Sequence, residues 1–335
     1  MASESKITVL VALAANLLIA VAKLVGGLVS GSSSMLAEAA HSVADTINQV
    51  FLLTSLKVAA RPADPVHPFG YGKARFFWSL LAAVGIFVAG AIFSVYEGVH
   101  TLIHGSEGGS ILVPYIVLGV AFVAEGSSWL RAVAQVRREA AAAGRPVLRY
   151  ARESKDPTLK TVLSEDTAAV IGLLLAAVGI GMHKLTGESW WDGAAAIAIG
   201  VLLAVVAVLL GRDSRDLLIG EAADPELVRD VYRRLSEAAE ITEVVELLTM
   251  HLGPETVLVA ARIDLGDELA SSDIEDFSGR MDAELTAAWP AIRQVFLDPT
   301  RGDPDLTART RAHFESLAHD RRPSDIMDGR AKGEQ

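Results

Sequence analysis

The sequence predicts an α-helical membrane protein, with six transmembrane helices followed by a C-terminal cytoplasmic α+β domain. Three observations predict this fold: long apolar stretches fill the first two-thirds of the 335 residues, Lys and Arg gather in alternate loops, and the last third is acidic. Residues 1–211 hold 15 Lys and Arg against 14 Asp and Glu, whereas residues 212–335 hold 15 against 27. We expect a transmembrane domain at 1–211, an α+β domain at 212–299 and a flexible tail at 300–335.

Six stretches are long and apolar enough to cross a bilayer, which takes about 20 helical residues. Residues 193–211 carry no charge, and residues 7–29 carry only Lys23. The second stretch is the least apolar, because it holds Glu38, His41 and Asp45. The predicted spans are residues 7–29, 34–59, 77–103, 111–135, 159–184 and 190–211.

The loops between these spans predict the orientation. The loops at 60–76 and 136–158 contain Lys and Arg, whereas the short loops near 30–33, 104–110 and 185–189 contain none. Basic loops stay on the cytoplasmic side, so both termini are expected in the cytoplasm. We expect the plasma membrane, since we recognise no targeting presequence in the chain.

The acidic third has the pattern of a compact two-layer fold. Asp224 followed by Pro225 is a helix start, and the helix runs to about residue 239. Period-two apolar alternation predicts strands at 241–252 and 256–265, followed by a helix at 272–288 and a strand at 292–297. The order α-β-β-α-β predicts a ferredoxin-like α+β domain.

Composition excludes several classes of function. The chain has no Cys, which excludes disulfides, thiolate metal sites and thiol nucleophiles. The acidic C-terminal third argues against nucleic acid as a partner, because phosphate binding needs a basic surface. Neither a phosphate-binding glycine loop nor a nucleophile constellation is present, so we do not expect an enzyme.

Ionisable side chains within two spans are the candidates for function, because each costs about 2.5–3.5 kcal/mol to insert into a membrane. His41 and Asp45 are four residues apart, so they share one helix face, and Glu38 lies one turn earlier. Glu165 and Asp166 lie in the fifth span. Nitrogen and oxygen ligands without sulfur fit Zn²⁺, and also Mn²⁺, Fe²⁺ or Co²⁺. The alternative is that His41 is a hydrogen-bonded core residue with Asp45 as its partner.

Three segments resemble one family. They are SMLAEAAHSVADTINQ at 34–49, HPFGYGKAR at 67–75 and LSEDTAAVIG at 163–172. Together with the six-span layout they resemble the cation diffusion facilitator family of divalent-metal transporters, and within it the zinc transporter 9-like subgroup. The resemblance implies a homodimer that exports Zn²⁺ or a similar cation from the cytoplasm, with protons as the counter-ion.

The resemblance also implies where the cation binds. The family places two ligands on the second span and two on the fifth, each pair four residues apart. His41, Asp45 and Asp166 match three of these ligands, whereas the fourth position holds Val162. Either Glu165 supplies the fourth ligand, or the site has three protein ligands and a water. The third possibility is a non-transporting regulator or scaffold whose metal site is vestigial.

Two accessory metal sites implied by the resemblance are incomplete. The loop site keeps Asp64 and His67 but has Tyr71 in place of a His. A site in the C-terminal domain keeps Asp298, and His251 could contribute to it, although we interpret His251 as a surface residue. The domain itself is implied to be a dimerisation module.

Overall fold

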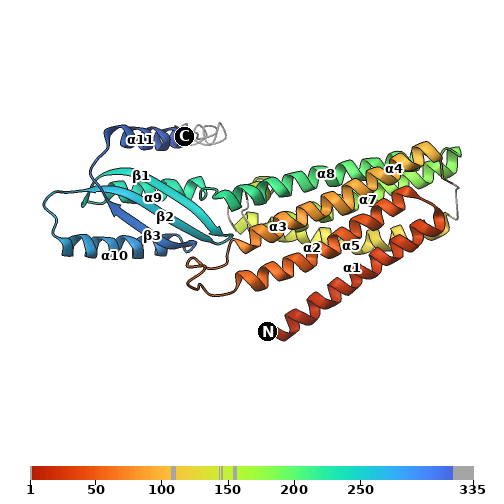
Figure 1. Cartoon of the computed structure of the whole chain (residues 1–335), viewed down its shortest axis with the longest axis horizontal. Coiled ribbons are helices and arrows are strands. Elements are labelled where there is room, and N and C mark those ends of the chain that lie inside the picture. The colour runs from red at the N-terminus through yellow and green to blue at the C-terminus, as the bar shows by residue number, and fades with distance from the viewer. Residues whose placement is uncertain (1, 107–110, 143, 145, 154–156, 320–335) are drawn as a thin grey trace, which may run out of the picture. The chain divides into compact units, whose positions relative to one another are not determined.

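The computed structural model in Figure 1 describes residues 2–106, 111–142, 144, 146–153 and 157–319. Parts of the loops expected at 104–110 and 136–158, and the end of the expected tail, lie outside these residues. The chain divides into two compact units, Met1–Leu218 and Ile219–Gln335. Each unit has its own apolar core.

The first unit is a bundle of long helices (Figure 1). Five helical segments in the described residues are long and apolar enough to cross a membrane: Leu13–Ser30, Ala74–His104, Leu112–Ala142, Leu159–Thr186 and Trp190–Ile219. They belong to α1 (Ala2–Ser30), α3 (Ala74–Gly85) with η1 (Ile86–Ile92) and α4 (Phe93–His104), α5 (Leu112–Ala142), α7 (Pro157–Thr186) and α8 (Trp190–Ile219). A short helix, α6, spans Val147–Glu153.

The remaining predicted span is α2 (Ser33–Ala59), which is long enough to cross a membrane but less apolar than the others. Its buried positions include Glu38, His41 and Asn48 beside alanines such as Ala37 and Ala44. It packs against α1, α3, η1, α4 and α7. Because α2 has neighbours on several sides, buried polar side chains such as these face other helices rather than the outside of the bundle.

The predicted span at 77–103 is helical throughout but is not a regular α-helix. Residues Ile86–Ile92 form a π-helix between α3 and α4. Further along, Gly98 lies so close to α8 that a Cβ on it would meet the Gly193 carbonyl oxygen at 2.6 Å. Glycines at the contact therefore permit the close approach of α4 and α8.

The second unit contains a three-stranded sheet with helices packed against it. Its elements are α9 (Pro225–Glu237), β1 (Ile241–Gly253), β2 (Thr256–Leu265), α10 (Ser271–Ala288), β3 (Ile292–Pro299) and α11 (Pro304–His319). The strand order is β1-β2-β3, with β1 antiparallel and β3 parallel to β2. The buried core includes Val231, Leu235, Phe277 and Leu285.

The region from residue 300 differs from the flexible tail expected from the sequence. Residues Pro304–His319 form α11, whose first turn is capped by Asp303 Oδ1, 3.1 Å from the backbone nitrogens of Asp305 and Leu306. Phe314 is buried and stacks on Tyr232, with 4.0 Å between ring centroids. The single buried aromatic side chain anchors this helix, and composition did not reveal it. Residues 320–335 lie outside the described part of the chain.

Candidate metal site

His41 and Asp45 lie together on one face of α2, as their spacing predicts. His41 Nδ1 is 3.5 Å from Asp45 Oδ1, and the two side chains are 1% and 19% exposed. Within the described residues, neither ring nitrogen of His41 has a hydrogen-bond partner, and neither does Asp45 Oδ1. His41 is therefore a buried residue beside Asp45, without a hydrogen bond between the two side chains.

On α7, Glu165 and Asp166 lie in different surroundings. Asn48 Nδ2 donates to both carboxylate oxygens of Glu165, at 2.6 and 2.7 Å. Asp166 Oδ2 is buried and accepts no hydrogen bond from the residues that the structure describes. Both carboxylates interact electrostatically with Asp45, so the packing of α2 against α7 brings the two predicted halves of the site near each other.

Unpaired atoms of this kind call for a physical explanation. More than about 90% of buried polar groups in proteins have a hydrogen-bond partner. Here His41, Asp45 and Asp166 all present unpaired atoms of the types that ligate divalent cations. However, among the described residues no group of three His, Asp or Glu side chains lies close enough to hold a metal ion. The arrangement therefore offers ligand atoms without a closed coordination shell.

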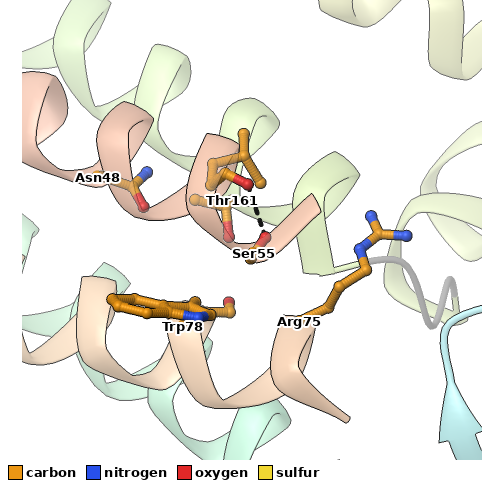
Figure 2. A pocket seen from close by; sticks show the side chains of 7 residues that line it. Asn48, Ser55, Arg75, Trp78 and Thr161 are labelled. Atoms are coloured by element: carbon orange, nitrogen blue, oxygen red, sulfur yellow. Dashed lines mark hydrogen bonds between the residues drawn. The ribbon is translucent and has the colours of Figure 1, made fainter. Parts of the chain in front are cut away.

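A narrow pocket lies beside Asn48, between α2, α3 and α7 (Figure 2). Its volume is about 10 Å³, which is close to the space needed by one water. Its other lining residues are Leu52, Ser55, Arg75, Trp78, Ser79 and Thr161. Its lining includes both Asn48, whose amide holds Glu165, and Arg75 at the start of α3.

Glu38 does not join the ligand atoms of His41 and Asp45. Instead, Glu38 Oε2 accepts from Lys23 Nζ of α1 at 2.9 Å, and the same ammonium donates to Glu125 Oε1 of α5 at 2.7 Å. Lys23 and Glu38 are both completely buried. The sequence marked Lys23 only as a charge within a span, and nothing in its spacing identified both partners.

Asp192, at the start of α8, is a buried acid that the spacing of residues in the sequence did not identify. Its carboxylate accepts from the backbone nitrogens of Ser33 and Ser34 at 2.7 and 3.4 Å, and from the hydroxyls of Ser32, Ser33 and Ser34. These groups form the N-terminus of α2. One helix therefore caps another, and the carboxylate lies where the helix dipole favours negative charge.

In the loop between α2 and α3, Asp64 is fully engaged by hydrogen bonds. Its carboxylate accepts from Tyr71 Oη at 2.6 Å and from the backbone nitrogens of Val66 and His67 at 3.0 and 2.7 Å. The hydrogen bond from Tyr71, helped by those from the backbone, holds the pKa of Asp64 below its usual value. The ring of Tyr71 also stacks on His67, at 4.2 Å between centroids. Asp64 and His67 are thus brought together, but the Asp64 carboxylate already accepts a hydrogen bond from the Tyr71 hydroxyl.

The structure does not bring His251 and Asp298 together. His251 lies on β1 opposite Val257 of β2, whereas Asp298 lies on β3 opposite Arg262. Five residues of β2 separate the two registers, or about 16 Å along the strand. His251 is also buried, at 5% exposure, which corrects our interpretation of it as a surface residue. Asp298 instead lies 3.4 Å from Arg262 Nε.

The comparisons with known proteins agree with this architecture. Residues 9–219 match the family model described as the cation efflux transmembrane domain. The chain is 32% identical over 292 residues to the mouse protein named proton-coupled zinc antiporter SLC30A9, mitochondrial, covering 86% of this chain and 52% of that protein. It is 35% identical to the Xenopus laevis protein of the same name over 309 residues, which are 92% of this chain and 54% of that protein.

A bacterial relative has another metal in its name. The chain is 24% identical over 316 residues to the manganese efflux system protein MneP of Bacillus subtilis, covering 89% of this chain and 97% of that protein. The chain spans about half the length of the vertebrate relatives.

The apolar helices and the family match define the class of protein: the chain is an integral, multi-pass membrane protein of the cation diffusion facilitator family. Within that family it groups with the zinc transporter 9-like proteins, to which it is 32–35% identical.

Proposed function

We propose that this chain exports a divalent cation, Zn²⁺, from the cytoplasm in exchange for protons. The observation that carries the proposal is the set of buried, unpaired ligand atoms of His41, Asp45 and Asp166 within a cation efflux domain. Because these ligands must be deprotonated to bind a metal, protons and Zn²⁺ compete for them. Relatives named as proton-coupled zinc antiporters support the choice of both ions.

The arrangement of the chain in the membrane is part of the proposal. We propose that α2 also crosses the membrane, which brings the number of spans to six. We further propose that both termini lie in the cytoplasm, as the charged loops favour, and that the membrane is the plasma membrane. Because the vertebrate relatives are named as mitochondrial, localising the tagged chain tests the choice of membrane. We further propose a homodimer joined through the second unit, in which α9 to β3 form a ferredoxin-like domain.

The test is Zn²⁺ uptake into proteoliposomes with an acidic interior, measured for the wild type and Asp166→Ala. The wild type is expected to take up Zn²⁺ only while the pH gradient lasts, since outward proton movement drives uptake. Asp166→Ala removes the carboxylate that carries the unpaired Oδ2 atom and should reduce uptake at least about 100-fold. Failure of the wild type to transport Zn²⁺, Mn²⁺, Fe²⁺ or Co²⁺ would support a non-transporting regulator instead.

Glu165→Gln tests whether Glu165 supplies the ligand that Val162 cannot. If the carboxylate leaves Asn48 and binds the cation, the substitution removes a charged ligand, and we expect at least about a 10-fold loss of Zn²⁺ uptake. Glu139→Gln, at a carboxylate whose hydrogen bonds with Gln135 and Tyr150 lie away from these ligands, serves as the matched control. Uptake within twofold of the wild type would assign the fourth position to water.

Manganese is the second candidate cargo, because the Bacillus relative is named for manganese efflux and Val162 removes one ligand from the family pattern. A site with three protein ligands and waters suits a cation that tolerates a larger coordination number than Zn²⁺. Competition by Mn²⁺ against labelled Zn²⁺ in the same vesicles separates the two cargoes.

A further inference from the structure

A buried lysine lies between two carboxylates where α1, α2 and α5 pack together. Lys23 Nζ is 2.9 Å from Glu38 Oε2 and 2.7 Å from Glu125 Oε1. Lys23 and Glu38 are completely buried, and Glu125 is 17% exposed. We call Lys23, Glu38 and Glu125 the lysine triad. One ammonium faces two carboxylates, so the triad has a surplus negative charge when all three groups are ionised.

The second oxygen of each carboxylate has no hydrogen-bond partner. Glu38 Oε1 and Glu125 Oε2 are both buried, and no donor among the described residues reaches either of them. Glu38 Oε1 lies against Gly172 of α7, where a Cβ would approach to 2.1 Å, so only glycine leaves space for this oxygen. A surplus negative charge with two unpaired acceptor atoms is costly in a low-dielectric bundle. One more small cation at the triad would remove that cost.

The chemistry of the triad favours a proton over a metal ion. The ammonium of Lys23 is within 2.9 Å of both carboxylates and would repel a divalent cation bound to either. A proton needs one acceptor atom rather than a coordination shell. Its addition leaves one ammonium, one carboxylate and one neutral acid, a set with no net charge.

We propose that Glu125 binds the exchanged proton at Oε2, at a site separate from the cation ligands on α2 and α7. This inference rests on the proposed function. Asp45 and Asp166 interact electrostatically with Glu125. A divalent cation bound to Asp45 and Asp166 would cancel their negative charge. Glu125 would then bind its proton less tightly and release it.

The charged surroundings of Glu125 come from every helix that packs near it. The groups that interact electrostatically with Glu125 are Lys23 on α1, Glu38 and Asp45 on α2, and Asp166 on α7. His41, Glu165 and Arg131 interact in turn with members of this set. The acids outnumber the bases, so the proton is held by the combined charge of the cluster. This combined charge is what changes when a cation arrives.

The test measures Zn²⁺ uptake and proton efflux together, in proteoliposomes containing the full chain and with the membrane potential clamped. In Glu125→Gln, Zn²⁺ uptake down its own gradient should persist, while proton efflux per Zn²⁺ should fall at least about fivefold. Glu125→Asp keeps an ionisable group and should retain coupling. Glu97→Gln, which changes a partly exposed acid on α4, is the matched control and should behave as the wild type.

Each other outcome overturns the proposal. Wild-type proton efflux per Zn²⁺ in Glu125→Gln removes Glu125 as the proton site, and loss of Zn²⁺ uptake in this variant places it on the cation path. A wild type without any flux would overturn the proposed function as well. If Glu125→Gln does not reconstitute, Glu125→Asp provides the test. The shorter side chain loses its contact with the Lys23 ammonium, so the pH of half-maximal coupled flux should move to a higher value. An unchanged pH profile contradicts the proposal.

Discussion

Asp45→Ala is expected to abolish cation transport while the helix bundle stays folded. Asp45 contributes a buried oxygen without a hydrogen-bond partner among the described residues, 3.5 Å from His41. Removing a metal ligand costs at least the 10–100-fold loss seen for residues that merely support ligands, so Zn²⁺ uptake should fall at least about 100-fold. Uptake into vesicles with an acidic interior measures the effect.

The stability of this variant separates a ligand from a structural residue. Because the Asp45 oxygen has no hydrogen bond to lose, alanine removes a buried charge and should change the free energy of unfolding by no more than about 1 kcal/mol. Asp216→Ala, at a half-exposed carboxylate that pairs with its exposed neighbour Arg215, is the control for loss of charge. A large drop in thermal stability of Asp45→Ala, together with lost transport, would make Asp45 a structural residue and contradict its role as a ligand.

The sequence predicted the parts of the site that depend on one helix. His41 and Asp45 are four residues apart, and helical periodicity alone places them on one face, as the 3.5 Å approach confirms. Contacts between helices could not be predicted in this way. Lys23 meets Glu125 across 102 residues of sequence, and Asn48 meets Glu165 across 117. These pairs depend on how each helix is rotated in the bundle, which packing decides.

The same distinction holds for the fold. Strand and helix bounds in the second unit were predicted to within a few residues, because turn residues such as Gly253 and Pro254 mark them locally. The helix α11 was missed, although Asp303 before Pro304 is a helix start of the same kind as Asp224 before Pro225. The absence of apolar periodicity hid it, since one buried aromatic, Phe314, anchors the helix to the core. The burial of His251 was missed because a lone histidine has no pattern.

Asp192→Ala is expected to destabilise the bundle strongly, and more than Asp45→Ala. The carboxylate accepts two backbone N–H groups and three hydroxyls at the start of α2, and its side chain is completely buried. Alanine leaves these donors without their acceptor and removes the negative charge at the helix N-terminus. A buried donor left unpaired costs about 1–3 kcal/mol, so we expect a loss of at least about 3 kcal/mol in the free energy of unfolding.

Thermal unfolding in detergent measures this effect, with Glu188→Ala as the matched control, because Glu188 is an exposed acid four residues earlier in the chain. The control should stay within about 0.5 kcal/mol of the wild type. Asp192→Asn keeps one acceptor oxygen but loses the charge, so its stability should lie between those of the wild type and the alanine variant. Equal stability of Asp192→Ala and Glu188→Ala would mean that water satisfies the N-terminus of α2 as well as the carboxylate does. In that case the carboxylate would not be what holds α8 against the N-terminus of α2.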